Sequence, residues 1–354
     1  MYKIIIALLV ISTSPVLLLS CKKESVASVP EVPVSGSLTN KYDIVVAKDG
    51  SGTYNTVQKA FDAVPNSSTK RTVIYIKNGT YKEVLTLASA KKNVTIIGES
   101  ATGVILTYDN YSSKIDPATG LGYGTSGSAS TFIRAEGLYA VNITFENSSG
   151  PVGQALAISI LADKAIFLNC RFLGRQDTIY GDRCRQYFKD CYIEGSTDYI
   201  FGPSTAFFEK CTLYNYGGSA ITAASTESYV TYGYVFSNCK IESEAGKVTT
   251  LGRPWRPYAA VAYLNCTINS SIKAAGWDNW GNPENEKTAR YSEYNNTGPG
   301  ATLTSRPAWI KRLTEAEASQ YTVSNILGTT YVNPGIKDSW NPLTVIESTG
   351  AAAK

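Results

Sequence analysis

Residues 165–214 read AIFLNCRFLGRQDTIYGDRCRQYFKDCYIEGSTDYIFGPSTAFFEKCTLY, and one short phrase occurs three times in this stretch. The phrase is a polar residue, a cysteine, a variable residue and a larger apolar residue, and its copies begin at Asn169, Asp190 and Lys210. Alternating apolar and polar positions after a polar turn are typical of a β-strand with one buried face. The copies begin 21 and 20 residues apart, which indicates a repeated structural unit.

The same phrase, with a small apolar residue in second place, extends through most of the chain. Further copies begin at Asn93, Asn142, Asn238 and Asn265, so that all intervals lie between 20 and 28 residues except one double step of 49. Intervals in the twenties are the signature of a solenoid with one coil per repeat. We therefore predict an all-β fold, a single-stranded parallel β-helix, with residues 56–64 and 315–327 as short capping helices.

The second position of the phrase is a cysteine in five successive repeats. A uniform inward slot, repeated about every 4.8 Å, favours identical stacked residues, so we predict that these cysteines pack in the core. Core packing leaves room for one disulfide among them; metal binding and catalysis are the alternatives, and the chain has no CxxC pair. Cys184 lies outside the repeat, and its role is not predicted. The five cysteines of the repeat are Cys170, Cys191, Cys211, Cys239 and Cys266.

Composition limits the chemistry that the chain can perform. It has 354 residues, 43% of them hydrophobic, which is enough for a sizeable core. The net charge of +4 fits an acidic polymer as partner but is too small to indicate nucleic acid. The chain contains no histidine, which excludes Ser-His-Asp and Cys-His catalysis and histidine-ligated zinc. Any hydrolysis must use carboxylates, Arg, Lys, Tyr or Cys.

The N-terminal residues resemble an export signal of the lipoprotein type. Lys3 precedes an apolar run over residues 4–19, which ends in Leu-Leu-Ser before Cys21, as in a bacterial lipobox. We expect a signal peptide over 1–20, a lipid on Cys21 and a flexible tether over 21–41, with an ordinary cleaved signal as the alternative. The catalytic domain would span 42–345, and a C-terminal tail 346–354. The expected location is the outer membrane, facing periplasm or cell surface, with the anchor as the only membrane contact.

Two aspartates keep the register of the repeat. Asp177 follows Cys170 by seven residues, and Asp198 follows Cys191 by seven. Coils in register would stack the two carboxylates roughly 5–7 Å apart. Each aspartate alone is explained by a turn, but a stacked pair repels and separates its pKa values, leaving one group ionised and one protonated. That division suits acid–base catalysis, including that of retaining or inverting glycosidases.

The motifs around these aspartates identify a family resemblance. The motifs are VAKDGSGTY (46–54), GQALA (153–157), QDTIY (176–180), DYIFG (198–202), LGRPW (251–255), GWDNW (276–280) and YSEYNNTGPG (291–300). In this order and over about residues 42–327, they resemble the pectin methylesterases, and the resemblance implies a right-handed β-helix that hydrolyses methyl esters of pectin. Ile179 and Tyr199 replace a commoner Leu and Phe, and residues 221–226 lack the Gln-Gly-Arg of many plant members.

The resemblance also implies a role for each residue. Asp198 would be the nucleophile and Asp177 the general acid and base. Gln154 and Gln176 would stabilise the oxyanion, and Arg253 would orient Asp198.

Three aromatic residues, Trp255, Tyr180 and Phe201, would bind the sugar chain. No cofactor or metal is expected, pectin is the expected partner, and the expected state is a monomer. The alternatives are a β-helix enzyme of the polygalacturonase or pectate lyase type and a non-catalytic carbohydrate-binding solenoid. The former would need a third catalytic aspartate or a calcium site, and neither pattern is found.

Overall fold

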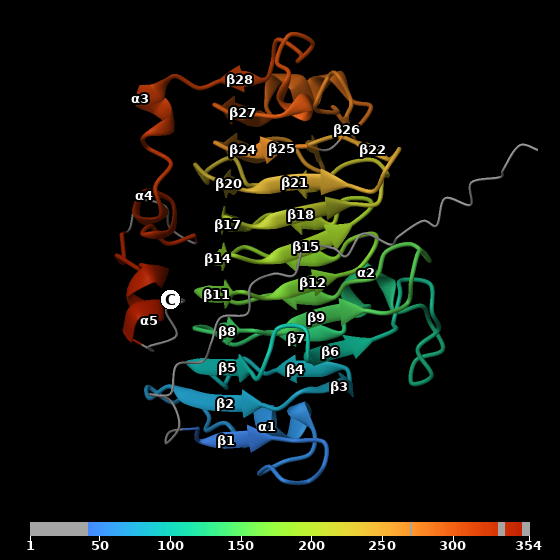
Figure 1. Cartoon of the computed structure of the whole chain (residues 1–354), viewed down its shortest axis with the longest axis vertical. Coiled ribbons are helices and arrows are strands. Elements are labelled where there is room, and N and C mark those ends of the chain that lie inside the picture. The colour runs from blue at the N-terminus through green and yellow to red at the C-terminus, as the bar shows by residue number, and fades with distance from the viewer. Residues whose placement is uncertain (1–41, 270, 332–336, 349–354) are drawn as a thin grey trace, which may run out of the picture. The chain divides into compact units, whose positions relative to one another are not determined.

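The fold is a stack of coils whose short strands form parallel sheets (Figure 1). The computed structural model describes residues 42–269, 271–331 and 337–348. Sheet A has eleven strands: β1 (Ile44–Val46), β2 (Thr72–Ile76), β5 (Val94–Gly98), β8 (Tyr139–Val141), β11 (Ala165–Leu168), β14 (Arg185–Lys189), β17 (Thr205–Glu209), β20 (Tyr234–Ser237), β24 (Ala260–Leu264), β27 (Arg290–Tyr294) and β28 (Lys311–Arg312).

Two further sheets form the other sides of the coil. Sheet B has eight strands: β3 (Gly79–Lys82), β6 (Val104–Tyr108), β9 (Thr144–Asn147), β12 (Arg171–Leu173), β15 (Tyr192–Gly195), β18 (Thr212–Asn215), β21 (Lys240–Ser243) and β25 (Thr267–Ile268). Sheet C has seven strands: β4 (Leu85–Leu87), β7 (Thr131–Ile133), β10 (Ile158–Ile160), β13 (Ile179–Gly181), β16 (Ile200–Gly202), β19 (Thr222–Ala224) and β23 (Gly252–Pro254). A small pair joins β22 (Val248–Thr249) to β26 (Ser271–Ile272).

Each coil visits the sheets in the order A, B, C. One coil is β11, β12 and β13, and the next is β14, β15 and β16. Their strands pair in parallel, as in Ile166 with Tyr187 and Ile179 with Ile200. The predicted right-handed parallel β-helix is confirmed.

In six of the seven predicted repeats, the polar first residue forms the corner between sheets A and B. Asn93 is the exception, because it precedes β5 of sheet A; the predicted double step of 49 residues is therefore wrong, since β5 and β8 lie on adjacent coils. Asn142 (φ 55°), Asn169 (φ 49°) and Asp190 (φ 52°) all have left-handed backbone conformations. Asn and Asp tolerate this region better than other residues with a side chain, which explains their recurrence. The Asn169 amide also donates a hydrogen bond of 2.8 Å to Asn142 Oδ1 on the coil before it.

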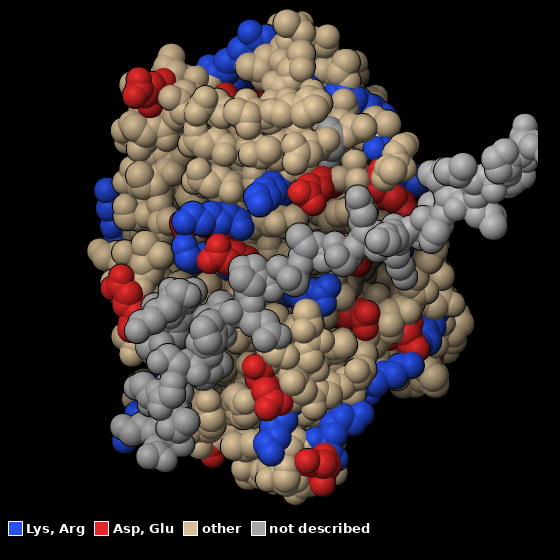
Figure 2. Space-filling view, viewed as in Figure 1, with Lys and Arg blue, Asp and Glu red and all other residues tan. Residues whose placement is uncertain are grey.

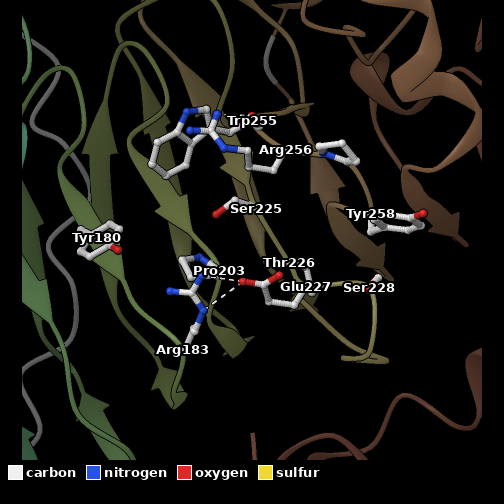
Figure 3. A pocket seen from close by; sticks show the side chains of 11 residues that line it. Tyr180, Arg183, Pro203, Ser225, Thr226, Glu227, Ser228, Trp255, Arg256 and Tyr258 are labelled. Atoms are coloured by element: carbon white, nitrogen blue, oxygen red, sulfur yellow. Dashed lines mark hydrogen bonds and ion pairs between the residues drawn. The ribbon is translucent and has the colours of Figure 1, made fainter. Parts of the chain in front are cut away.

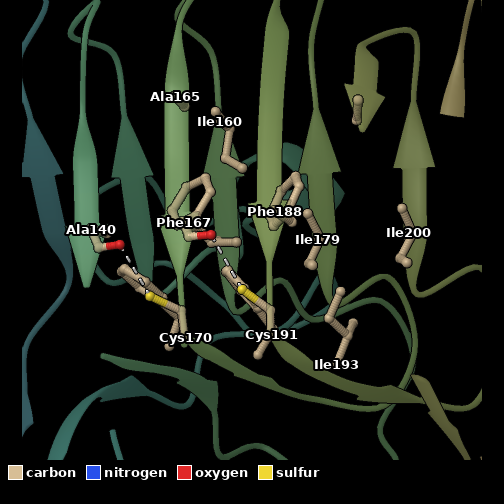
Figure 4. Packing of buried hydrophobic residues seen from close by; sticks show 14 of the residues in the cluster. Ala140, Ile160, Ala165, Phe167, Cys170, Ile179, Phe188, Cys191, Ile193 and Ile200 are labelled. Carbon is tan, nitrogen blue, oxygen red and sulfur yellow. Dashed lines mark hydrogen bonds between the residues drawn. The ribbon is translucent and has the colours of Figure 1, made fainter. Parts of the chain in front are cut away.

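The interior is filled by ladders of like residues (Figure 4). Phe188 stacks on Phe208 and Phe208 on Phe236, with ring centroids 4.5 Å apart in each step. The five cysteines of the repeat are at most 2% exposed and unbridged, and their thiols donate to backbone carbonyls, as Cys191 does to Phe167 O at 3.5 Å. The prediction of core packing is confirmed. No group of three or more potential metal ligands occurs among residues 42–269, 271–331 and 337–348.

Cys184 lies in the turn before β14 and is 2% exposed. Its thiol contacts the carbonyl oxygen of Asp182 at 3.1 Å and accepts from the Gln186 amide at 3.1 Å. Burial raises the pKa of this thiol far above its ordinary value, so Cys184 is a packed neutral group.

The first expected helix closes the start of the stack. Helix α1 (Val57–Ala63) follows Thr56, whose side chain accepts from Lys59 N. Its buried face, Val57, Ala60 and Phe61, belongs to the hydrophobic core of the coils. The prediction for residues 56–64 is therefore correct to within a residue at each end.

The second expected helix is wrong in extent and position. Residues 315–327 form two helices, α3 (Glu315–Ala318) and α4 (Val323–Leu327), because Thr322 supplies a new N-cap between them. Helix α4 packs on β17, on the outer side of sheet A, where Leu327 joins an apolar cluster with Phe207. These helices therefore cover a side of the coil, not its end (Figure 1).

A third helix, α5 (Pro342–Ser348), covers the same outer side and continues past the boundary that the sequence suggested at residue 345. Arg185, 1% exposed, joins this C-terminal segment to the coils, since it donates to Asp163 on the coil and to both Asp338 oxygens at 2.6 and 2.8 Å. The remaining helical turns are α2 (Gly124–Gly127), η1 (Pro283–Lys287) and η2 (Pro299–Ala301).

Two general properties concern the surface. On the described part of the face in Figure 2, basic and acidic side chains are interspersed and do not gather into one field. Within the described residues, no helix has the length and apolarity needed to cross a bilayer.

Candidate active site

Asp177 and Asp198 occupy equivalent corners before strands β13 and β16. Both have left-handed backbones, with φ of 65° and 50°, which an aspartate tolerates. Gln176 pairs with Thr197, and Asp177 N donates to Thr197 O at 3.0 Å. The two aspartates are therefore direct neighbours on adjacent coils, as the register of the repeat predicted.

Both carboxylates open into one cavity of about 350 Å³. The cavity brings together all five residues predicted to carry the chemistry, together with two of the three predicted sugar-binding aromatics. Its lining is Thr125, Gln154, Gln176, Asp177, Asp198, Phe201, Ala223, Arg253, Trp255 and Trp280.

Arg253 forms a two-pronged ion pair with Asp198. Its Nε donates to Oδ1 at 2.9 Å, and its Nη2 donates to Oδ2 at 2.6 Å. The Asp198 side chain is 8% exposed and that of Arg253 is 22% exposed, so water screens the pair weakly. This fork holds the Asp198 carboxylate in one orientation.

The two carboxyl groups differ in their readiness to ionise. Burial, followed by the charge of Asp198, raises the pKa of Asp177 from 3.8 to about 8, although Arg253 and Gln176 oppose the shift. Burial also raises the pKa of Asp198, but the hydrogen bonds and charge of Arg253 counteract this. Near neutral pH, Asp177 thus holds a proton beside an ionised Asp198. The sequence had predicted this division from the stacking alone.

Gln154 and Gln176 form one row at the rim of the cavity. Their backbones pair in parallel, so the two amides come from the same corner of successive coils. Amide N–H groups aimed into a cavity beside a carboxylate can stabilise an oxyanion that forms there.

The aromatic residues follow the outer surface of sheet C. Tyr180, Phe201, Ala223 and Arg253 are consecutive register partners on β13, β16, β19 and β23. Ring centroids lie 5.0 Å apart for Tyr180 and Phe201, and 5.9 Å apart for Phe201 and Trp255. Phe201 is only 6% exposed, so its ring edge lines the cavity while most of it packs against neighbours.

Tyr180 lines a second cavity of about 510 Å³, which adjoins the first because Trp255 lines both. Figure 3 shows two arginines on separate sides of this second cavity. Arg183 is paired with Glu227, to which Nε and Nη2 donate at 2.9 and 2.6 Å. The guanidinium of Arg256 stacks on Trp255, 4.7 Å from the ring centroid, and donates to Trp255 O at 2.9 Å. Among the described residues it forms no ion pair, so the two cavities form a groove with a cation that no carboxylate neutralises at one side.

Three lining residues, Thr125, Ala223 and Trp280, were not predicted as part of the site. Trp280 was noticed only within the motif 276–280, although an aromatic residue followed by glycine in a polar loop was a usable signal. Thr125 lies in α2, which belongs to a long insertion between β6 and β7, and nothing in the sequence of that insertion marked it.

A family model described as Pectinesterase matches residues 43–330. The chain belongs to the pectinesterase family. Pectinesterase 31 of Arabidopsis thaliana is 42% identical over 283 residues, which cover 78% of this chain and 89% of that protein. A probable pectinesterase/pectinesterase inhibitor of Brassica napus is 38% identical over 80% of this chain, but this chain spans only 50% of its length.

Solved pectin methylesterases share the fold. The enzyme from carrot superposes with a TM-score of 0.77 at 31% identity, covering 81% of this chain and 93% of that one. A pectin methylesterase crystallised with a hexasaccharide gives a TM-score of 0.73 at 29% identity, covering 85% and 98%. As a pectinesterase, the chain is a carboxylic ester hydrolase that removes methyl groups from pectin.

Proposed function

We propose that Asp198 attacks the methyl ester of a galacturonate unit and that Asp177 handles the protons. The observation that supports this most is the pair itself: one buried carboxylate held ionised by an arginine fork, beside another with a pKa near 8. A carboxylate is a weak nucleophile, so its orientation by Arg253 and the exclusion of water both contribute to its reactivity.

In the first half-reaction, an Asp198 oxygen bonds to the ester carbon and the carbonyl electrons move onto oxygen. The amides of Gln154 and Gln176 stabilise that oxyanion. When the tetrahedral intermediate collapses, the bond to the methoxy group breaks and Asp177 gives its proton to the departing methanol. The galacturonyl group is then joined to Asp198 as an anhydride.

In the second half-reaction, water replaces methanol. Asp177, now ionised, takes a proton from water as the water oxygen bonds to the galacturonyl carbon. Cleavage of the anhydride restores the Asp198 carboxylate and leaves a carboxylic acid on the polymer, which then loses its proton to the solvent. One ester and one water thus give one acid and one methanol, and Asp177 regains its proton.

The groove along sheet C would hold the sugar chain. Trp255 lies between the two cavities, where its ring can stack on a sugar, and Tyr180 and Phe201 extend the apolar surface. Arg256 offers a cation to a carboxylate on a neighbouring unit of the polymer. We also propose that the chain works as a monomer, because one chain supplies every residue of the site.

The N-terminal predictions concern residues 1–41, which lie outside the described residues. We propose that residues 1–20 export the chain, that Cys21 carries a lipid, and that 21–41 tether a catalytic domain beginning at 42 in the outer membrane. The lipobox-like residues before Cys21 support this. A Cys21→Ser chain that remains in the membrane fraction after export would contradict the lipid anchor.

The activity is tested by product analysis on methylated pectin. An esterase releases methanol without new reducing ends and without unsaturated sugars. A glycosidase on the same fold would create reducing ends, a lyase would create unsaturated products, and a binding solenoid would give none of the three. Chelators should leave methanol release unchanged, since no step of the proposed mechanism uses a metal.

A further inference from the structure

Trp280 lies directly against the arginine that holds the nucleophile. The guanidinium carbon of Arg253 is 3.9 Å from the centroid of the Trp280 ring. The same guanidinium donates both of its hydrogen bonds of the fork to Asp198. Arg253 is thus held by a carboxylate at its N–H edge and by an indole ring beneath it, an arrangement in which cation–π attraction adds to the ion pair.

The loop that presents Trp280 is built to hold it in place. Trp280 has a φ of 64°, an uncommon conformation for a bulky residue; the residue is 37% exposed and lines the cavity. Its backbone N–H donates to Asp278 Oδ1 at 2.7 Å, and Asp278 N donates to Gly252 O at 3.1 Å. The loop is therefore attached to β23 beside Arg253 itself. Conformations of this kind persist where the surroundings impose them and often serve a function.

Asp278 places a second negative charge near Arg253. Its charge raises the pKa of Arg253, as that of Asp198 does, and it also raises the pKa of Asp198. Yet the hydrogen bonds of the fork all go to Asp198. The ring beneath the guanidinium restricts the directions in which its N–H groups can point, which favours the fork to Asp198.

We propose that Trp280 is a positioning residue, which keeps the N–H fork of Arg253 on Asp198 and away from Asp278. The inference rests on the proposed function, because it matters only if Asp198 is the nucleophile. The alternative role for Trp280 is to bind the sugar by stacking, without acting on Arg253, since the ring lines the cavity. The two roles differ in the kinetic constant that they affect: misplacing the nucleophile lowers kcat, whereas losing a sugar contact raises KM.

The test uses Trp280→Ala, Trp280→Phe and the double variant Trp280→Ala with Asp278→Asn in the full chain. Trp280→Ala should lower kcat for methanol release about tenfold, the scale of a partly buried cation–π contact, with KM changed less than twofold. In the pH profile of kcat/KM of Trp280→Ala, the acid limb should move to higher pH, because a displaced Arg253 no longer lowers the pKa of Asp198. Trp280→Phe should recover most of kcat. Adding Asp278→Asn to Trp280→Ala should recover part of the lost kcat, because the second negative charge near Arg253 is gone. The Asn side chain still offers its Oδ1 as acceptor to the backbone N–H of residue 280.

Tyr258→Ala is the matched control. Tyr258 is also an exposed aromatic with a positive φ (44% exposed, φ 68°), and it lines the adjoining cavity. The Tyr258→Ala variant should raise KM and leave the acid limb of the kcat/KM profile at the wild-type pH. If Trp280→Ala behaves like Tyr258→Ala, or if neither Phe nor the second substitution restores kcat, the positioning role is refuted. A wild-type chain that releases no methanol would instead refute the proposed function.

Discussion

Replacing Asp177 by Asn should stabilise the fold at neutral pH while it destroys turnover. The Asp177 carboxyl is 7% exposed, and burial together with the charge of Asp198 raises its pKa from 3.8 to about 8. Between pH 3.8 and about pH 8, Asp177 keeps its proton in the folded chain but releases it in the unfolded chain. The stability of the wild type therefore decreases, relative to a chain without this group, as the pH rises from about 4 to about 8.

The size of the effect follows from the same two values. This difference in proton binding lowers the free energy of unfolding of the wild type by at most about 4 kcal/mol at pH 7 and by at most about 6 kcal/mol above pH 8. The amide of Asn cannot reproduce every contact of a protonated carboxyl, so we expect a gain of about 2 kcal/mol at pH 7. For a domain of this size that corresponds to roughly 3 °C in melting temperature.

The assay is urea unfolding, followed by tryptophan fluorescence, at pH 4, 5.5, 7 and 8.5. The unfolding free energy of Asp177→Asn minus that of wild type should be about −1.5 kcal/mol at pH 4 and near zero at pH 5.5, and it should grow up to about pH 8. Asp62→Asn, on the exposed face of α1, controls for the exchange of a carboxylate for an amide. A difference that stays constant with pH, or a variant that is less stable throughout, would refute the account of the paired carboxyls.

Three further outcomes are expected. Gln176→Ala should lower kcat by about 100-fold with little change in KM, since removal of an oxyanion donor affects the transition state; an unchanged kcat in steady-state assays would exclude that role. Arg256→Gln should raise KM several-fold on partly de-esterified pectin, which carries free carboxylates, but not on fully methylated pectin. Equal effects on both substrates would show that Arg256 does not recognise a carboxylate of the polymer. Arg185→Met should lower the unfolding free energy by about 3 kcal/mol and expose the segment 337–348 to proteases, because Asp163 and Asp338 lose their shared partner; unchanged proteolysis would contradict its role in holding that segment.

The coil geometry was predictable because the repeat records it directly. A polar residue at the left-handed corner and a cysteine in the inward slot after it mark the same two positions on five successive coils, as at Asn169 and Cys170. Once the coils are in register, the separation of Asp177 and Asp198 equals one coil. That equality placed the catalytic pair side by side without further information.

Features outside the repeat were less predictable. Residues 315–327 have the composition of one helix, but Thr322 starts a second one, and the apolar side of α4 is drawn to the exterior of sheet A. Trp280 and Thr125 reach the cavity from loops whose paths depend on the tertiary structure. The pKa of Asp177 depends on burial, which the sequence does not state.

The most direct test of the mechanism is methanol release by Asp198→Ala on methylated pectin, alongside an unfolding curve for the same preparation. The account predicts that the rate falls by at least about 1,000-fold, as expected for loss of a nucleophile, while the unfolding transition stays cooperative. A folded Asp198→Ala chain that releases methanol at the wild-type rate would contradict the assignment of Asp198 as the group that attacks the ester.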